Sequence, residues 1–72
     1  MRIISQDRKQ SVDFKRAYLW MQYNTIYVNY GNERKVFGTY ETDERASEVF
    51  MDIHEAYEKN ICRNNVYLMP DR

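Results

Sequence analysis

The sequence predicts an α+β fold, in which a small antiparallel sheet of three to five strands packs against one amphipathic helix. Two observations predict it. The segments before residue 40 are rich in β-branched and aromatic residues, as strands are. Residues 40–60 instead repeat apolar residues with the 3.6-residue period of a helix. We therefore expect a single domain over residues 1–72, with a β-meander at about 2–40, a helix at about 43–60, and a short strand or tail at 61–72.

The centre of the meander is predicted from two strands and the residues between them. Ala17–Tyr23 and Thr25–Tyr30 carry the strand-forming residues, and Asn24 between them tolerates a left-handed turn conformation. Gly31 and Asn32 follow, and glycine at the first central position is what a type II′ hairpin turn needs. Two consecutive hairpins are therefore expected.

The remaining strands are shorter or carry a special residue. Arg34–Tyr40 would return from the second turn, and Gly38 within it indicates a bulge or the close approach of another backbone. Arg2–Ser5 is predicted to be an edge strand, Ser11–Phe14 is ambiguous, and Val66–Met69 would be a final strand.

The helix has clear end signals and one apolar stripe. Thr42 is the expected N-cap and Asn60 the expected end. At 100° per residue, five apolar residues share the face expected to cover the sheet: Ala46, Val49, Phe50, Ile53 and Tyr57. Removing a large member of this stripe, as in Phe50→Ala or Ile53→Ala, is expected to cost about 2–5 kcal/mol of stability.

Composition excludes several classes of protein. The formal net charge is zero, which argues against a general nucleic-acid binder. No apolar run approaches the ~20 residues of a membrane span, and the first residues lack the apolar core of a signal peptide. The lone Cys62 cannot form an internal disulfide and fits a reducing compartment. We therefore expect a cytoplasmic protein without a membrane contact.

The neutral total conceals a segregation of charge. Residues 1–40 hold seven basic and three acidic side chains, whereas residues 41–60 hold seven acidic and two basic ones. The sequence thus predicts a basic sheet and an acidic helix.

The strongest candidate for a binding surface is the aromatic sheet face that one helix would leave uncovered. Strand alternation points Tyr18, Trp20 and Gln22 to one side, and Leu19, Met21 and Tyr23 to the other. Tyr27 and Phe37 are expected to join one set, and Ile26, Val28 and Val36 the other. Large exposed aromatic patches mark interfaces. Tyr18, Trp20 and Tyr27 are therefore candidate partner-binding residues. Cover by residues 1–14 or 61–72, a homodimer and a foreign partner all stay open.

The outer face of the helix supplies a second candidate surface. Glu44, Glu48 and Asp52 would lie about 6 Å apart along one line, close to the spacing of phosphates on a nucleic-acid strand. Such a line is either a solvated surface or a decoy for a basic groove in a partner protein.

No catalytic, cofactor or metal site is predicted. His54 is the only histidine, and its neighbour Glu55 points about 100° away on a helix, so the two do not form a working pair. Cys62 is followed by Arg63, which could raise its reactivity, but no Cys–His enzyme pattern is present.

Several segments resemble a family of small, largely uncharacterised proteins from phages, prophages and other mobile elements of Gram-positive bacteria. The matching segments are Ile3–Asp7 (IISQD), Ser11–Phe14 (SVDF), Gly38–Tyr57 (GTYETDERASEVFMDIHEAY) and Tyr67–Pro70 (YLMP). The resemblance brings no catalytic motif. It implies a phage or mobile-element gene product in a host bacterial cell, of a size class that includes inhibitors of host defence systems.

Two functions are expected from these observations. The first is a non-enzymatic interaction protein that binds a host protein and modulates or inhibits it. The alternative is a small module that binds a ligand or single-stranded nucleic acid by stacking on Trp20 and the tyrosines. Quenching of tryptophan fluorescence by nucleotides would favour the second.

Overall fold

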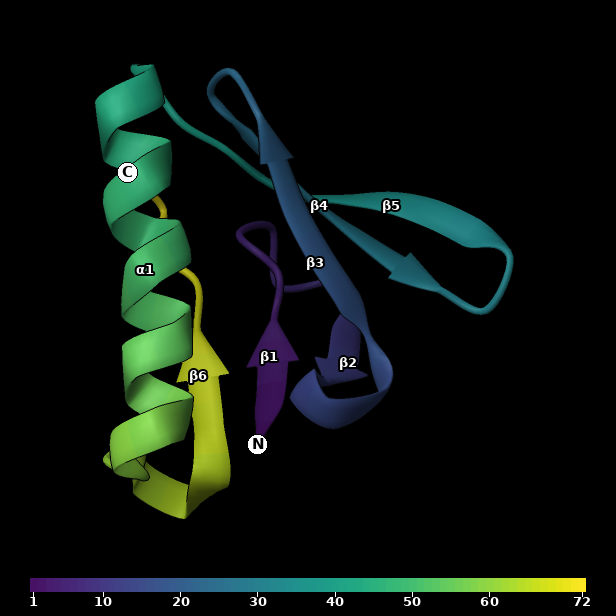
Figure 1. The fold of residues 1–72 in the computed structure, drawn as a ribbon, viewed down its shortest axis with the longest axis vertical. Coiled ribbons are helices and arrows are strands. Elements are labelled where there is room, and N and C mark those ends of the chain that lie inside the picture. Colours follow the sequence, from purple (N-terminus) through teal and green to yellow (C-terminus); the bar gives the residue numbers. More distant parts are fainter.

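A computed structural model describes residues 1–72 and confirms the α+β fold class. One helix, α1 (Asp43–Lys59), stands beside two three-stranded sheets (Figure 1). The strands are β1 (Arg2–Ile4), β2 (Ser11–Asp13), β3 (Tyr18–Gln22), β4 (Thr25–Tyr30), β5 (Glu33–Thr39) and β6 (Val66–Leu68). Two short 3-10 turns, η1 (Phe14–Arg16) and η2 (Arg63–Asn65), precede β3 and β6.

The first sheet differs from the expected meander. Its order is β2-β1-β6, so β1 lies in the centre with an antiparallel partner on one side and a parallel partner on the other. Ile3 pairs with Val12 of β2 and with Tyr67 of β6. The prediction that Arg2–Ser5 is an edge strand is therefore wrong. The partner that places β1 in the centre comes from the far end of the sequence, which local patterns do not reveal.

The second sheet, β3-β4-β5, is the predicted pair of hairpins. Both turns have two residues, because Gln22 pairs with Thr25 and Tyr30 with Glu33. Gly31 has the positive φ, 63°, that its turn position requires. In the first turn the positive φ, 56°, belongs to Tyr23 and not to Asn24, so the assignment of the left-handed residue there is wrong.

The register of β5, counted from the Gly31 turn, decides which of its residues face the core, and a bulge follows at Phe37. Val36 pairs with Tyr27, whereas Gly38 pairs with Ile26, so Phe37 is the extra residue between them. Phe37 is buried with 4% of its surface exposed, and Val36 is 51% exposed. The predicted faces of Phe37 and Val36 are therefore both wrong. Counting the register back from the Gly31 turn would have placed Val36 opposite Tyr27.

Of the two features predicted at Gly38, the bulge lies beside it, whereas the close approach is made by side chains and not by another backbone. A Cβ atom at this position would lie 2.8 Å from Cε of Met69 and 3.0 Å from the ring of Tyr40. Met69, which follows β6, is fully buried. The absent side chain at Gly38 therefore allows the segment after β6 to pack against the β5 strand.

The helix ends are as predicted. The hydroxyl of Thr42 accepts a hydrogen bond from the Arg45 backbone N–H at 3.0 Å, and Asn60 ends the helix in the left-handed conformation with φ 53°. The N-cap satisfies one of the free N–H groups of the first turn, and Asp43 and Glu44 complement the positive end of the helix dipole.

The buried stripe of α1 differs from the predicted one at two positions. The residues that are buried are Ala46, Val49, Ile53 and Ala56. Phe50 is half-buried, and Tyr57 is 36% exposed and stacks on Phe14 of η1 with ring centroids 4.4 Å apart. Ala56, which is 3% exposed, takes the position near the core that the prediction gave to Tyr57.

The core lies between α1 and the two sheets. Ile3 and Val12 come from the first sheet, and Ile26, Val28 and Phe37 come from the second. The helix contacts both β3 and β4. Figure 1 shows the turn between β4 and β5 on the side of the molecule away from α1. The helix thus covers one face of the second sheet and leaves the opposite face open.

Candidate interaction surface

The open face of the β3-β4-β5 sheet presents three rows of side chains across the strands. We call this set the outer sheet face. The strand register gives its rows as Tyr18, Asn29 and Arg34; Trp20, Tyr27 and Val36; and Gln22, Thr25 and Thr39. None of these nine residues is fully buried. Because helix α1 packs on the other side, no element of the chain covers this face.

The middle row is fixed by contacts among its own residues. The rings of Trp20 and Tyr27 stack with centroids 4.4 Å apart and an interplanar angle of 18°. Nε1 of Trp20 donates a hydrogen bond to Oδ1 of Asn29 at 3.2 Å, and Cζ of Arg34 lies 5.5 Å from the centre of the Tyr27 ring. These contacts hold large, flat side chains in place before a partner binds, which lowers the entropy cost of binding.

The edges of the same face are the most exposed. Tyr18 is 67% exposed, and Val36 of the middle row is 51% exposed. An apolar and aromatic surface next to a guanidinium has the composition of binding hot spots. The sequence predicted that Tyr18, Trp20 and Tyr27 share one face, and the structure brings them together. Arg34 and Val36 were missed as members, although counting register from the Gly31 turn could have found them.

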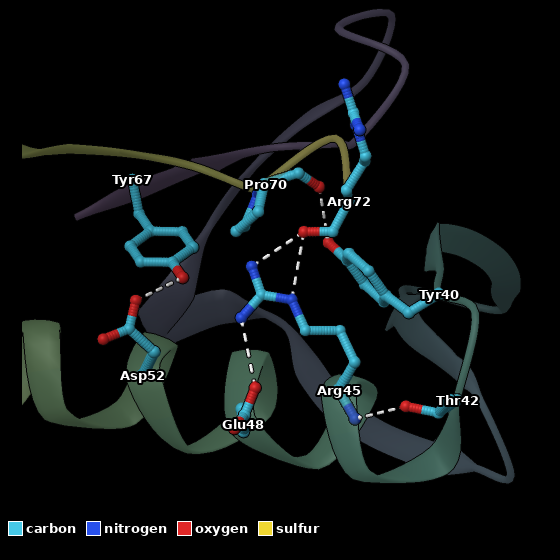
Figure 2. A network of polar contacts seen from close by, with 8 residues as sticks. All are labelled: Tyr40, Thr42, Arg45, Glu48, Asp52, Tyr67, Pro70 and Arg72. Atoms are coloured by element: carbon cyan, nitrogen blue, oxygen red, sulfur yellow. Dashed lines mark hydrogen bonds and ion pairs between the residues drawn. The ribbon is translucent and has the colours of Figure 1, made fainter.

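The three acidic residues predicted to form a line lie on α1, away from the outer sheet face. They do not share one environment. Oε1 of Glu48 pairs with Nη1 of Arg45 at 3.3 Å, and Oδ2 of Asp52 accepts a hydrogen bond from the Tyr67 hydroxyl at 2.7 Å (Figure 2). Glu44 is exposed and makes no ion pair. Two of the three carboxylates are therefore engaged within the fold.

Asp52 and Glu48 border a network that holds the last residues of the chain. Four consecutive main-chain oxygens each accept a hydrogen bond from a side chain. Arg8 donates to Met69 at 2.7 Å, Tyr40 to Pro70 at 2.8 Å, Gln6 to Asp71 at 3.1 Å, and Arg45 to Arg72 at 2.7 and 3.0 Å. Figure 2 shows Tyr40 and Arg45 reaching this segment from beside the helix N-terminus. The network is structural: it attaches residues 69–72 to the fold.

Two tyrosines in the same region have raised pKa values. Burial raises the pKa of Tyr67, and the hydrogen bond to the Asp52 carboxylate raises it further, because both disfavour a phenolate. Burial also raises the pKa of Tyr40. Both phenols therefore remain protonated donors at neutral pH and in moderately alkaline solution.

The potentially reactive side chains outside these surfaces, His54 and Cys62, are packed within the fold. Nδ1 of His54 lies 2.8 Å from the Phe50 carbonyl oxygen, and its ring packs edge-on against Phe14. Cys62 is partly buried. No cluster of three or more histidine, cysteine or acidic side chains is placed to hold a metal ion. Helix α1 lacks the combination of length and apolar character that a membrane-crossing helix has.

Two open hollows lie on the surface. One, of about 240 Å³, lies between β2 and the β4-β5 hairpin, with Val12, Val28 and Phe37 at its base and Lys35 and Glu33 at its rim. Lys35 and Glu33 form an exposed ion pair at 3.2 Å. The other, of about 470 Å³, lies beside the network of residues 69–72 and includes Arg45 and Arg72. Neither hollow contains an unpaired buried polar side-chain atom.

Comparison with protein-family models, with curated proteins and with solved structures finds no match to this chain. Functional inference therefore depends on the surfaces described above.

Proposed function

We propose that this protein is a non-enzymatic interaction protein that binds another protein through the outer sheet face. The observation that carries the proposal is the middle row: Trp20 and Tyr27 are stacked, fixed and only partly buried, and they stand beside exposed Val36. Burying such a surface against a partner is favourable at about 25 cal/mol per Å² of apolar area.

The charge around the face adds a preference in the partner. Arg34 lies on the face, and Lys15 and Arg16 precede β3; all three are exposed and none forms an ion pair within the chain. A partner surface with acidic residues around an apolar centre would match this pattern. The resemblance to small phage and mobile-element proteins extends the proposal to a host bacterial protein, such as a component of a defence system, whose activity the bound protein would inhibit.

The test is affinity capture from bacterial lysate with variants of the face. Tyr18→Ser combined with Val36→Thr removes the two most exposed apolar groups of the outer sheet face without changing charge. Met51→Ser is the matched control, because Met51 is 62% exposed on the helix. We expect a partner that the unchanged protein and the Met51 variant retain and the face variant loses. Retention that is equal in all three proteins would reject the outer sheet face as the binding surface.

A second function is favoured by one observation, the position of Arg34 over the Tyr27 ring beside Trp20. Aromatic rings with nearby cations bind single-stranded nucleic acid or nucleotides by stacking. Here the two rings already stack on each other, which leaves only their outward surfaces for a base. Titration of Trp20 fluorescence with short oligonucleotides of each base distinguishes the functions: salt-sensitive quenching supports the stacking module, and unchanged emission supports the protein-binding function.

A further inference from the structure

We propose that a second copy of this chain pairs with the free edge of β3, so that two β3-β4-β5 sheets join into one six-stranded antiparallel sheet. This interface uses the edge of the sheet. It joins backbone groups at the edge, where Tyr18, Trp20 and Gln22 of the outer sheet face also meet their counterparts, and it does not depend on the proposed function.

The edge of β3 carries unused backbone hydrogen-bonding groups. In a two-residue hairpin the closing residues, Gln22 and Thr25, form a hydrogen-bonded pair, and such pairs alternate along the ladder. The N–H and C=O groups of Leu19 and Met21 consequently point away from β4. No backbone hydrogen bond outside the β3-β4 ladder reaches β3. A strand placed alongside would satisfy these groups.

The opposite edge of the same sheet is closed by the chain itself. The backbone N–H of Gln6 donates to the Phe37 carbonyl at 2.8 Å, and its side-chain oxygen accepts from the Thr39 N–H at 2.8 Å. The side chain of Gln10 donates to the Val36 carbonyl at 3.0 Å. Only the β5 edge is protected in this way.

β3 also lacks the features that keep edge strands from pairing. Proteins usually protect an edge with charged residues, a proline or a bulge. The sequence of β3, YLWMQ, contains no charge and no proline, and its pairing with β4 is regular over all five residues. The strand is therefore suited to accept a neighbour.

The sequence of β3 is self-complementary in one antiparallel register. With the two-fold axis at Trp20, Leu19 of one copy lies opposite Met21 of the other, so that outward-pointing groups meet outward-pointing groups. Tyr18 lies opposite Gln22 of the second copy, and the two Trp20 residues lie side by side. The row of Val36, Tyr27 and Trp20 then continues across the axis into the same row of the second copy.

Charge complementarity identifies the occupant as a second copy. In this register η1, which ends at Arg16 just before β3, approaches the Tyr23–Asn24 turn of the other chain. Asn24 is bonded to Tyr40 in both directions: its carbonyl accepts from the Tyr40 N–H at 2.9 Å, and its side chain donates to the Tyr40 carbonyl at 2.6 Å. The basic residues before β3 therefore lie roughly two strand spacings, about 10 Å, from the start of the acidic segment Glu41–Glu44 of the second copy.

Because the dimer has two-fold symmetry, this attraction occurs at both ends of the paired strands. Lys15 and Arg16 are exposed without an ion pair, as are the three acidic residues of the segment Glu41–Glu44. The segregation of charge along the sequence thus places the basic end of each strand near the acidic helix start of the other copy. A partner that lacked either the basic end or the acidic end would match only one end of β3.

The helices fit this arrangement. Because α1 contacts both β3 and β4, its axis lies over the region between them. Two copies joined at β3 would then place their helices about two strand spacings apart, roughly 10 Å, which is close to the separation of packed helices.

The test is the mass in solution, measured by size-exclusion chromatography with light scattering at concentrations up to about 1 mM. Tyr18→Lys with Gln22→Lys places like charges opposite each other at both ends of the paired strands. Tyr18→Lys with Gln22→Glu places opposite charges there. Both positions are exposed, and their β4 neighbours, Asn29 and Thr25, are uncharged. The two variants should therefore change the stability of the monomer equally, and thermal melting checks this.

The expected result is a species of twice the 8.9 kDa chain mass for the unchanged protein. The repulsive variant should dissociate with a dimer Kd raised roughly tenfold, and the complementary variant should remain dimeric. Added salt should weaken the unchanged dimer, because the complementary charges lie about one Debye length apart at 0.1 M. A protein that stays monomeric at every concentration, a dimer insensitive to both variants, or dissociation of both variants alike would overturn the proposal.

Discussion

Arg45 and Arg72 are joined by two hydrogen bonds, in which Nε and Nη2 of Arg45 donate to the main-chain oxygen of Arg72 at 3.0 and 2.7 Å. Arg45 also pairs with Glu48, so the first turns of α1 and the last residue of the chain are connected through one guanidinium. Because the donor group is charged and its planar geometry fits two bonds at once, this contact should be among the stronger polar contacts near the surface.

Replacing Arg45 tests how much the attached segment contributes. Arg45→Met retains most of the aliphatic side chain and removes the donors, and we expect a loss of about 1–2 kcal/mol in the free energy of unfolding. Urea denaturation measures it. Lys59→Met is the control, because Lys59 makes only an exposed pair with Glu55 at 3.3 Å and should change stability by less than about 0.5 kcal/mol. Equal losses in both variants would show that the Arg45 contacts contribute nothing specific.

The stability of the fold should fall in alkaline solution. The pKa of Tyr67 is raised in the folded state above the value near 10 of an unfolded tyrosine. A raised pKa contributes stability that is fully present below pH 10 and is lost as the pH rises above it, because the unfolded chain then releases its proton first. Tyr67→Phe removes the ionisable hydroxyl and with it this contribution to the pH dependence. The unfolding free energy of that variant, measured by denaturation between pH 8 and about 12, should fall less steeply than that of the unchanged protein.

Gly38→Ala should destabilise the fold by about 1–3 kcal/mol, because the new methyl group would overlap Cε of Met69 and the Tyr40 ring. Met69→Ala is destabilising by itself, since Met69 is fully buried. In the double variant the overlap with Met69 disappears, so the combined loss should be smaller than the sum of the two single losses. Strict additivity in thermal melts would contradict the close approach at Gly38.

The register of β5 predicts opposite outcomes for two adjacent residues. Phe37→Ala should cost about 3–5 kcal/mol, because the ring is buried, whereas Val36→Thr should cost less than about 1 kcal/mol. Chemical denaturation of the two variants measures the difference. If the alternation expected from the sequence were correct, the order of the two losses would be reversed.

The helix orientation predicts a similar contrast. Ile53→Ala should cost about 2–5 kcal/mol, since Ile53 is fully buried, and Phe50→Ala should lie near the lower end of that range because its ring is half-buried. Tyr57→Ala removes a 36% exposed ring that stacks on Phe14 and should cost less than Ile53→Ala. A loss for Tyr57→Ala that exceeds the loss for Ile53→Ala would require a different helix rotation.

The parts of the fold that depend on neighbouring residues were predictable. The caps at Thr42 and Asn60 and the glycine turn at Gly31 follow from local chemistry, and each is found where the sequence places it. The stacked pair of Trp20 and Tyr27 follows from strand alternation across a short hairpin. Such features need only a few residues of context.

The parts that were missed depend on distant segments. The central position of β1 requires β6, which comes from the other end of the sequence. Residues 69–72 are attached partly by hydrogen bonds from Gln6 and Arg8. Nothing in the sequence distinguishes these two polar residues from other surface residues. The faces of Phe37 and Val36 are an exception, because counting from the Gly31 turn alone places Val36 opposite Tyr27 and Phe37 on the other face.

The parallel pairing of β1 with β6 has a consequence for synthesis. Arg2 pairs with Val66 and Ile4 with Leu68, so β1 cannot complete its pairing until β6 has been made. Closing a loop of this length costs chain entropy before any contact compensates it, and contacts of high sequence separation slow folding. On the ribosome, the hairpins β3-β4-β5 can form early. β1 can reach its final place only after residues 66–68 have emerged from the exit tunnel, so the β1-β6 pairing forms after the hairpins.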